Sequence, residues 1–490
     1  MEAIINFFTG TLNTVAWLYI FLPCTIVGGL YLTIRNRGIQ FTRFGYAMKN
    51  TVGKMFQKQE AGAGAVTPLQ AVTTALAATV GTGNIVGTSQ AIALGGYGAV
   101  FWLWLAALLG MIIKYSEVTL SIKYRERDAK GDWVGGPMYY VKNGLGKHWQ
   151  WVGVLFCVFA AIASFGIGNM SQLNSIAGNM NAAFGVPTIV TGLALMVVTA
   201  LIVIGGLKRV AAVTEKLVPL MALFYIAGAL IIVAMHAGNI PAAFGAIFKG
   251  AFNLQAAGGG ALGYGISQTI TWGFKRGAFS NEAGLGSAVM VNSASNVKEP
   301  VHQGMWGVFE VFADTIVVCT LTALVILTTG VVDLQSGAVL ANVQDNALVG
   351  QAFTAAFGSF GPKFIAISIL LFAYSTTLGW SHYGTKAVEY LFGTTGSRIY
   401  KVVFVGMTVV GSTMKLGLAW DLSDTFNGLM MIPNLIGVLA LSGTVVAITK
   451  NYLDRRVKGL EIEPMWSAFE EYQKQEEAEA AAEEAAQRGQ

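Results

Sequence analysis

The stretch ATVGTGNIVGTSQ, residues 78–90, lies inside an apolar run that is otherwise typical of a membrane-spanning helix. Gly81, Gly83 and Gly87 fall within seven residues, and Asn84 lies among them. Gly and Asn weaken a helix, and an unsatisfied backbone group is costly in hydrocarbon. The stretch therefore indicates either a break around a cavity or ligand, or close packing of two helices through small residues.

The composition places the whole chain in a membrane. Of its 490 residues, 54% are hydrophobic and 12% are charged, and the mean hydropathy is +0.58. A soluble protein would carry about 25% charged residues. Apolar runs long enough to cross a hydrocarbon core of roughly 30 Å recur from end to end. They lack the polar faces of helices in a soluble core, so we predict an all-α polytopic membrane protein.

The apolar runs define the expected spans. We predict eleven transmembrane helices, at residues 11–33, 68–94, 98–122, 151–183, 187–206, 217–235, 261–291, 304–330, 362–391, 399–418 and 424–449. The first is expected to be a retained span, because no basic region of a signal peptide precedes it. The basic and aromatic segment 35–58 is predicted to lie in the membrane interface.

Lys and Arg residues set the predicted orientation. Twenty-three of them fall in loops on one side of the predicted spans, against three on the other side, Lys249, Lys363 and Lys415. The positive-inside rule then places the N-terminus outside and the C-terminus in the cytoplasm. The net charge of +5 reflects this bias, partly masked by an acidic tail, so no nucleic-acid partner is expected. The tail, residues 456–490, is either a solvated helix, disordered, or docked under a basic cytoplasmic loop.

Metal-binding and catalytic patterns are absent from the sequence. Cys24, Cys157 and Cys319 lie in apolar runs without a CxxC pair, and the four histidines have no ligand spacing. They are expected to be buried structural residues rather than a transition-metal site. No paired carboxylates, HExxH motif or Ser/His/Asp set is placed for catalysis, so we do not predict an enzyme.

A second interruption is predicted in the span 261–291. Two cations, Lys275 and Arg276, lie there between Gly273 and Gly277. This span comes five spans after the stretch 78–90 and runs in the opposite direction. Interrupted helices at matching positions of two halves indicate an inverted-repeat transporter with a site near the bilayer midplane. The half-helix N-termini would attract a carboxylate, and the released carbonyls would attract a cation.

Four motifs carry a resemblance to a known family. They are GTGNIVGTSQAIALGGYGAVFWLWLAALLG at 81–110, KYSEVTLSIKYR at 114–125, GGPMYY at 135–140 and TWGFKRGAFSNEAGLGSA at 271–288. Over residues 10–455 the chain resembles the alanine or glycine:cation symporter family, which belongs to the amino acid–polyamine–organocation superfamily with the LeuT-type fold. Leu103 departs from the Met expected there, which should affect packing only.

The resemblance implies a LeuT-type 5+5 inverted repeat preceded by one extra helix. Residues 1–60 would hold the extra helix and interfacial segment, 61–236 the first five-helix repeat, 237–455 the second, and 456–490 the acidic tail. It implies Na+-coupled symport of a small neutral amino acid, alanine or glycine, into the cell by alternating access. The expected protein is a monomer in the cell inner (plasma) membrane, with Na+ as coupling ion and no organic cofactor.

The resemblance also implies a sodium site. Its ligands would be the carbonyls of Ala77, Val80 and Ala373 and the hydroxyls of Thr376 and Thr377. A site without carboxylates suits a weakly bound monovalent cation. The residues alone leave open that both hydroxyls bond to carbonyls of their own helix. A second sodium near Asn84 and Thr269 is the weaker expectation.

The expected substrate contacts surround the two interruptions. The substrate carboxylate would meet N–H groups, its ammonium would meet carbonyls, and aromatic rings would bound the side-chain pocket. The N–H groups are those around Thr82, Gly83 and Asn84. The carbonyls are those near Thr79, Trp272 and Gly273. The aromatic rings are Phe274, Trp272 and Trp380. Gln172, a polar residue at membrane depth, either contacts the substrate or forms an interhelical hydrogen bond.

Charged residues near the second interruption suggest a gate. Lys275, Arg276 and Glu282 are expected to form a cytoplasmic-side ion-pair gate with Glu117 or Glu310, or else a static network. Proton-coupled relatives place a lysine inside the helix that corresponds to 217–235, and none lies there. Sodium is therefore favoured over a proton-coupled or exchange-only carrier. Glutamine or serine remains the alternative substrate, and a membrane amino acid sensor would need a larger signalling domain than the tail.

Overall fold

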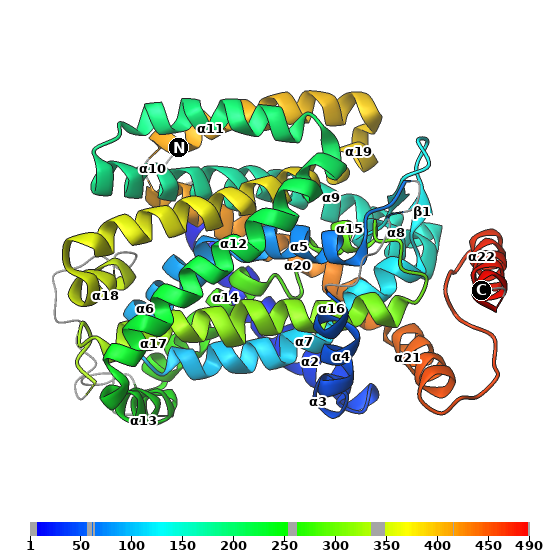
Figure 1. The fold of residues 1–490 in the computed structure, drawn as a ribbon, viewed down its shortest axis with the longest axis horizontal. Coiled ribbons are helices and arrows are strands. Elements are labelled where there is room, and N and C mark those ends of the chain that lie inside the picture. The colour runs from blue at the N-terminus through cyan, green and yellow to red at the C-terminus, as the bar shows by residue number, and fades with distance from the viewer. Residues whose placement is uncertain are drawn as a thin grey trace.

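The computed structural model describes residues 7–55, 61, 64–252, 262–334, 348–414 and 416–488 (Figure 1). Lys58 and Lys415 of the charge count, and the first residue of the predicted span 261–291, lie outside this part. The described chain is almost entirely helical. Its sheet has two strands, β1 (Glu126–Arg127) and β2 (Trp133–Val134), paired antiparallel with Glu126 opposite Val134.

The helices follow one another in chain order. In the first half they are α2 (Leu22–Arg35), α3 (Ile39–Thr42), α4 (Phe44–Asn50), α5 (Pro68–Thr79), α6 (Thr88–Gly95), α7 (Ala99–Lys123), α8 (Pro137–Tyr140), α9 (Gln150–Phe165), α10 (Ser171–Phe184), α11 (Thr188–Val203) and α12 (Gly206–Met235). In the second half they are α13 (Ile240–Ala251), α14 (Leu262–Asn281), α15 (Val289–Asn292), α16 (Pro300–Val311), α17 (Thr320–Thr328), α18 (Leu348–Phe357), α19 (Gly361–Thr413), α20 (Leu416–Ala440), α21 (Ser442–Arg456) and α22 (Glu470–Arg488).

Short segments with wider or tighter turns extend these helices. The π-helical ones are η1 (Phe7–Leu12), η2 (Val15–Phe21), η4 (Gly83–Gly87), η5 (Val141–Leu145), η7 (Gly166–Met170) and η9 (Phe312–Cys319). The 3₁₀ turns are η3 (Val52–Lys54), η6 (Lys147–Trp149), η8 (Ala237–Asn239) and η10 (Gly358–Phe360). Such π-helical turns inside helices are frequent at functional sites.

Six helical stretches of the described chain are long and apolar enough to cross a membrane. They are Thr9–Arg35, Ala99–Lys123, Lys147–Phe184, Gly206–Met235, Pro300–Thr328 and Leu348–Thr413. Asp424–Ala440 and Ser442–Arg456, bent by 56°, make a seventh if they form one span. The predicted span 362–391 and residues 399–413 of the predicted span 399–418 fall within α19, which turns at Gly393 (φ 68°, ψ −168°), and residues 416–418 belong to α20. The number eleven therefore stays a prediction.

The predicted break in the stretch 78–90 is confirmed. A capping box between Thr67 and Gln70 starts α5, which ends at Thr79, and Val80 leaves the helical conformation with ψ 88°. The chain resumes as η4 and then α6. The Asn84 side chain accepts a hydrogen bond from the Gly81 N–H at 2.9 Å, which satisfies a backbone donor inside the break.

The predicted interruption at Gly273–Gly277 is wrong, because α14 is helical from Leu262 to Asn281. The glycines there allow close packing instead: a Cβ on Gly273 would lie 2.5 Å from the Ala99 carbonyl oxygen of α7. The chain breaks after α14. Glu282, Gly284 and Gly286 take positive φ values of 56°, 90° and 74°, and α15 follows.

The two breaks lie beside each other. A Cβ on Gly83 would be 3.1 Å from the Ser280 Cα, and a Cβ on Gly95 would be 2.9 Å from the Trp272 Cβ. The order of these contacts along the chain is reversed, so α14 runs antiparallel to η4 and α6. Both α5 and α14 lie in the middle of the molecule, with α10 and α11 along one long edge (Figure 1).

Replacing Gly273 with Ala tests the continuous packing of α14. The added Cβ would meet backbone of α7, so we expect a loss of stability of about 1–3 kcal/mol. A Gly→Ala substitution inside a helix without such a contact usually stabilises it by about 1 kcal/mol. Gly406→Ala is the control, because a Cβ there meets nothing within 4 Å. Melting temperatures of both variants in detergent measure the effect, and a Gly273→Ala protein as stable as Gly406→Ala would contradict this packing.

Candidate binding site at the two breaks

A small cavity separates the two breaks. Its wall is formed by Ala78, Thr79, Gly81, Gly83, Ile167, Gln172, Phe279, Glu282, Thr376 and Trp380. These residues come from α5, η4, η7, α10, α14 and α19 and the two breaks. The cavity volume of about 10 Å³ holds at most about one water molecule. The structure is therefore closed around this point, and any larger ligand needs the walls to move apart.

The first break supplies backbone and a buried hydroxyl. Thr79 and Gly83 lie on the cavity wall, and Thr82 lies between them in the same turn. Thr82 Oγ1 is buried and has no hydrogen-bond partner in the described part of the chain. Asn84 holds the turn through the Gly81 N–H. It also contacts η9, because its Nδ2 donates to the Asp314 carboxylate at 2.7 Å.

Asp314 is a residue that the sequence analysis missed. It lies in η9, is fully buried, and also accepts hydrogen bonds from Ser280 Oγ at 2.8 Å and Thr315 Oγ1 at 2.7 Å. Its position in the predicted span 304–330, four residues after Glu310, was the available signal, since ionisable residues at membrane depth are usually functional. Its contact with Asn84 connects η9 to the first break.

Gln172 and Trp380 line the cavity from helices other than the two broken ones. Gln172 Nε2 donates to the Ile167 carbonyl at 2.8 Å, while its Oε1 is buried without a partner among the described residues. Trp380 Nε1 donates to Glu282 Oε1 at 2.7 Å, and its side chain packs on Gly168, where a Cβ would lie 2.2 Å away. Both predicted residues thus lie at the cavity, with polar atoms close to it.

Glu282 opens the second break and carries the one charge on the described cavity wall. It is 1% exposed and takes φ 56°, which is unusual for a residue with a Cβ. Its Oε2 accepts from Ser287 Oγ at 2.5 Å. Backbone strain of this kind concentrates at functional sites.

Trp272, Gly273 and Phe274 are not brought to the cavity, contrary to the expectation for substrate contacts. Because α14 stays helical to Asn281, these residues lie about two turns before the break, and the Gly273 carbonyl is not released. Trp272 Nε1 instead donates to Gln268 Oε1 at 3.1 Å, and Phe274 packs with Ala106 and Leu109 of α7. Phe279, further along α14, takes the aromatic position on the wall.

The five predicted sodium ligands are all buried where α5 meets α19. Ala77, Val80, Ala373, Thr376 and Thr377 are each at most 4% exposed. A Cβ on Gly81 would lie 2.2 Å from Thr376 Oγ1, so the first break touches the threonine pair directly.

The threonine hydroxyls hold hydrogen bonds within their own helix, which is the alternative that the sequence left open. Thr376 Oγ1 donates to the Phe372 carbonyl and Thr377 Oγ1 to the Ala373 carbonyl, both at 3.1 Å. Ser375, which the sequence analysis did not select, donates to the Ala77 carbonyl of α5 at 3.1 Å. An ion at this contact would have to draw these oxygens toward itself.

The predicted ion-pair gate is wrong in its partners. Lys275 and Arg276 pair with Asp424 of α20, at 2.7 and 3.2 Å, and Lys275 Nζ also reaches Asn13 Oδ1 at 3.2 Å. The contact with Asn13 shows that these cations lie near the chain's first helix. We call Lys275, Arg276 and Asp424 the outer triad.

A second buried charge cluster lies on α7 and α16. Lys114 Nζ is 3.2 Å from Glu310 Oε1, and both side chains are fully buried. Glu117 Oε1 accepts from Asn434 Nδ2 of α20, which also donates to the Gly284 carbonyl of the second break at 2.7 Å. Glu117 and Glu310 therefore belong to a network separate from the outer triad.

A larger cavity opens among loops that the charge count assigns to the cytoplasm. We call it the vestibule, with a volume of about 400 Å³. It is lined by Gly64, Ala65, Val66, Asp128, Lys130, Asp132, Trp133, Ile204, Gly205, Gly206, Leu207, Lys208, Ala294, His382, Thr385, Lys386, Glu389, Ser397 and Lys401. Helix α19 contributes to both cavities, through Thr376 and Trp380 to the small one and through His382 and Thr385 to the vestibule.

A chain whose described part is almost entirely helical, with apolar spans and a closed polar cavity between two broken helices, has the architecture of a secondary transporter. Residues 1–465 match the model of the family described as the sodium:alanine symporter family. The chain belongs to this family, which is a family of transporters and not of enzymes.

Relatives align over most of the chain. The sodium/alanine symporter AgcS of Methanococcus maripaludis is 44% identical over 448 residues, covering 91% of this chain and 97% of the relative. The amino-acid carrier protein AlsT of Bacillus subtilis is 38% identical, covering 94% and 95%. The probable sodium/glutamine symporter GlnT of Bacillus subtilis is 35% identical, covering 94% and 93%.

Solved structures share the fold at low identity. A mutant of the Eremococcus coleocola manganese transporter superposes with a TM-score of 0.51 at 12% identity, over 83% of each chain. MhsT in complex with L-phenylalanine gives 0.50 at 15% identity, over 80% of this chain and 99% of that one. These neighbours are LeuT-fold transporters, so the expected fold type is confirmed at this level.

The outer triad should be a strong structural contact. Asp424→Asn leaves the buried Arg276 and the partly buried Lys275 without this carboxylate, and removing one partner of a buried ion pair costs about 3–5 kcal/mol. We therefore expect a large drop in melting temperature in detergent. Glu470→Gln is the control, because that carboxylate pairs with Lys474 on an exposed face. Equal stability of the two variants would contradict the assignment of the triad.

Proposed function

We propose that this protein carries a small neutral amino acid, alanine or glycine foremost, into the cell together with Na+ by alternating access. The observation that carries the proposal is the closed polar cavity on which the first break, Glu282 and the Thr376 region converge. The names of the relatives AgcS and GlnT support sodium coupling, with alanine and glutamine as substrates. The smallness of the closed cavity favours the smaller side chain, since less widening is needed.

The proposed architecture has eleven spans in two inverted five-helix repeats, 61–236 and 237–455, after an extra helix within 1–60. We place it in the amino acid–polyamine–organocation superfamily, with the N-terminus outside and the C-terminus in the cytoplasm. The antiparallel contact between the broken stretches of α5–α6 and α14–α15 supports the repeat, because inverted repeats bring corresponding helices together in opposite directions.

In the proposed site, the N-terminus of η4 at Thr82 and Gly83 faces the substrate carboxylate, with Thr79, Gln172 and Trp380 around the rest of the molecule. A helix N-terminus suits an anion because it offers N–H groups and the positive end of its dipole. Asn84 holds the turn in place. The proposed ligands of the sodium ion are the carbonyl oxygens of Ala77, Val80 and Ala373 and the hydroxyl oxygens of Thr376 and Thr377.

One sodium per cycle supplies enough energy for scavenging uptake. Moving one charge across about 100 mV contributes roughly 2.3 kcal/mol, and a tenfold Na+ gradient adds about 1.4 kcal/mol. Together these sustain a substrate gradient of roughly 500-fold.

A proton-coupled or exchange-only carrier of the same fold is the second candidate. The buried Asp314 carboxylate favours it, because a carboxylate at membrane depth beside the first break can hold a proton. Uptake of radiolabelled alanine into proteoliposomes, with Na+ replaced by choline at constant pH, separates the two functions. Sodium coupling predicts loss of accumulation in choline, and unchanged accumulation favours the second candidate.

Replacing both hydroxyls of the proposed ion site should weaken Na+ binding. For Thr376→Ala plus Thr377→Ala we expect the Na+ concentration for half-maximal alanine uptake to rise about tenfold or more, equivalent to about 1.4 kcal/mol. Ser368→Ala is the matched control, since its hydroxyl bonds to the Phe364 carbonyl of the same helix away from the cavity. Wild-type Na+ dependence in the double variant would remove the proposed ion site.

A further inference from the structure

The charge on the cavity wall needs a partner. Glu282 is 1% exposed, and a buried carboxylate is costly unless it is paired. Two neutral donors reach it, Trp380 Nε1 on Oε1 and Ser287 Oγ on Oε2. An ionised carboxylate has about four acceptor positions, so it can accept further hydrogen bonds on the side that faces the cavity.

The buried cation Lys114 attracts Glu282 through its charge but makes its ion pair with Glu310. Lys114 pairs with Glu310 at 3.2 Å, and the outer triad neutralises Lys275 and Arg276 with Asp424. The cavity therefore places the Glu282 carboxyl group of the second break opposite the helix N-terminus of the first break. This polarity matches a zwitterion, whose carboxylate suits the N-terminus and whose ammonium suits a carboxylate.

We propose that Glu282 receives the ammonium group of the substrate, in place of the carbonyls near Trp272 and Gly273 expected from the sequence. The assignment rests on the amino acid substrate proposed above. It also gives the left-handed conformation of Glu282 a purpose, since φ 56° turns the chain just where the side chain must reach the cavity. The hydrogen bond from Trp380 then positions the carboxylate and closes one wall behind the ligand.

The test compares L-alanine with L-lactate, which keeps the carboxylate and the size but replaces the ammonium with a hydroxyl. Ligand-dependent thermal stabilisation of the purified protein at saturating Na+ gives both dissociation constants. Loss of one partner of a buried charge pair weakens binding by about 100-fold. For Glu282→Gln we expect the dissociation constant of alanine to rise about 100-fold and that of lactate to change less than about threefold. The preference for alanine over lactate should therefore be lost.

Two further variants keep the test decisive. Glu299→Gln removes a carboxylate that pairs with Arg455 and is not on the cavity wall, so the alanine-to-lactate ratio should stay at the wild-type value. Glu282→Asp keeps the charge and should retain part of the preference. An unchanged ratio in Glu282→Gln overturns the assignment, as does a change confined to the Na+ requirement. Failure of the wild-type protein to bind any neutral amino acid would instead overturn the proposed function.

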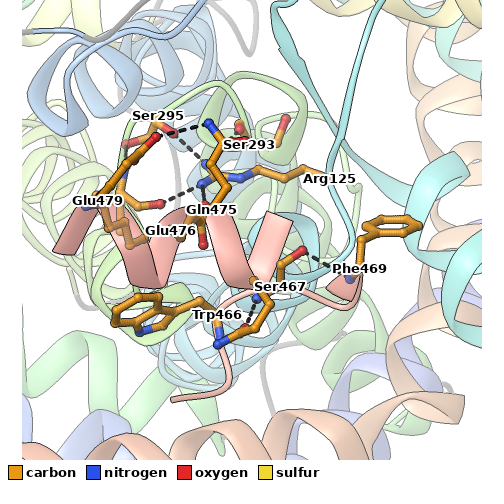
Figure 2. A network of polar contacts seen from close by, with 12 residues as sticks. Arg125, Ser293, Ser295, Trp466, Ser467, Phe469, Gln475, Glu476 and Glu479 are labelled. Carbon is orange, nitrogen blue, oxygen red and sulfur yellow. Dashed lines mark hydrogen bonds and ion pairs between the residues drawn. The ribbon is translucent and has the colours of Figure 1, made fainter. Parts of the chain in front are cut away.

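A different observation concerns the acidic tail, which docks on the body (Figure 2). Lys123 Nζ donates to the Ser467 carbonyl at 2.7 Å, and the Ala468 N–H donates to the Lys123 carbonyl at 2.9 Å. Arg125, 3% exposed, pairs with Glu476 of α22 at 2.9 Å. Burial raises the pKa of the Glu476 carboxyl above its usual value, and the Arg125 charge works against that rise.

Arg125 also holds the segment that follows the second break. Its guanidinium donates to the carbonyls of Ser295 and Val297 at 2.6 and 2.9 Å. This segment is hydrogen-bonded in turn to Val66, two residues before α5. The Val66 N–H donates to the Ala294 carbonyl, and the Asn296 N–H donates to the Val66 carbonyl, both at 2.9 Å. The tail thus reaches the cytoplasmic-side ends of both broken helices through one arginine.

We infer that α22 is a latch that holds the ends of α5 and α15 together on the vestibule side. Val66 and Ala294 both line the vestibule. They are hydrogen-bonded to each other, and Arg125 holds the carbonyls that follow Ala294. Movement of either half-helix away from the other would therefore break the hydrogen bonds around Arg125 or carry the tail with it. Undocking of the tail removes the Glu476 contact and leaves the vestibule easier to open.

Accessibility of the vestibule tests the latch independently of any substrate. Ser397 lines the vestibule and is 7% exposed, so Ser397→Cys should react with a maleimide faster when the vestibule widens. We expect Glu476→Gln to raise the labelling rate about fivefold, and Glu470→Gln, on the exposed face of the same helix, to leave it unchanged. Equal rates in the two variants, with unchanged melting temperatures, would overturn the latch.

Discussion

Backbone N–H and C=O groups shielded from water must find partners within the protein, and this chain interrupts two helices in its buried interior. Asparagine side chains supply partners at both places. Asn84 Oδ1 accepts from the Gly81 N–H and Asn281 Oδ1 from the Ala283 N–H, each at 2.9 Å. Asn434 adds a donor to the Gly284 carbonyl. With the turns held this way, the remaining polar groups can face a common cavity.

The local sequence predicted the first break because its cause is local. Three glycines and an asparagine weaken the helix in the stretch 78–90, and that asparagine caps the turn. The second break was misplaced because Gly273 and Gly277 resemble helix breakers but serve helix packing against α7. The positive φ values of Glu282, Gly284 and Gly286 mark the actual break, for which two glycines in the motif NEAGLGS were the available signal.

The sequence singled out several unusual residues, but it did not predict the contact partners of these residues that lie far away in the chain. Lys275 and Arg276 were recognised as unusual for a spanning helix, but their partner Asp424 comes from α20 and no spacing rule connects them. Gln172 and Trp380 were correctly brought near the breaks by the family resemblance, whereas Asp314, Ser375 and Phe279 were missed. Side-chain direction on a helix, which depends on crossing angles, decides which of these residues reach the cavity.

The central claim is that the two breaks together enclose the substrate. An experimental structure of the protein with alanine and Na+ tests it most directly. We expect the amino acid between Thr82–Gly83 and Glu282, with its carboxylate toward the first pair and its ammonium toward the glutamate. Alanine bound instead in the vestibule near Lys386 and Lys401, with an empty closed cavity at the breaks, would contradict it.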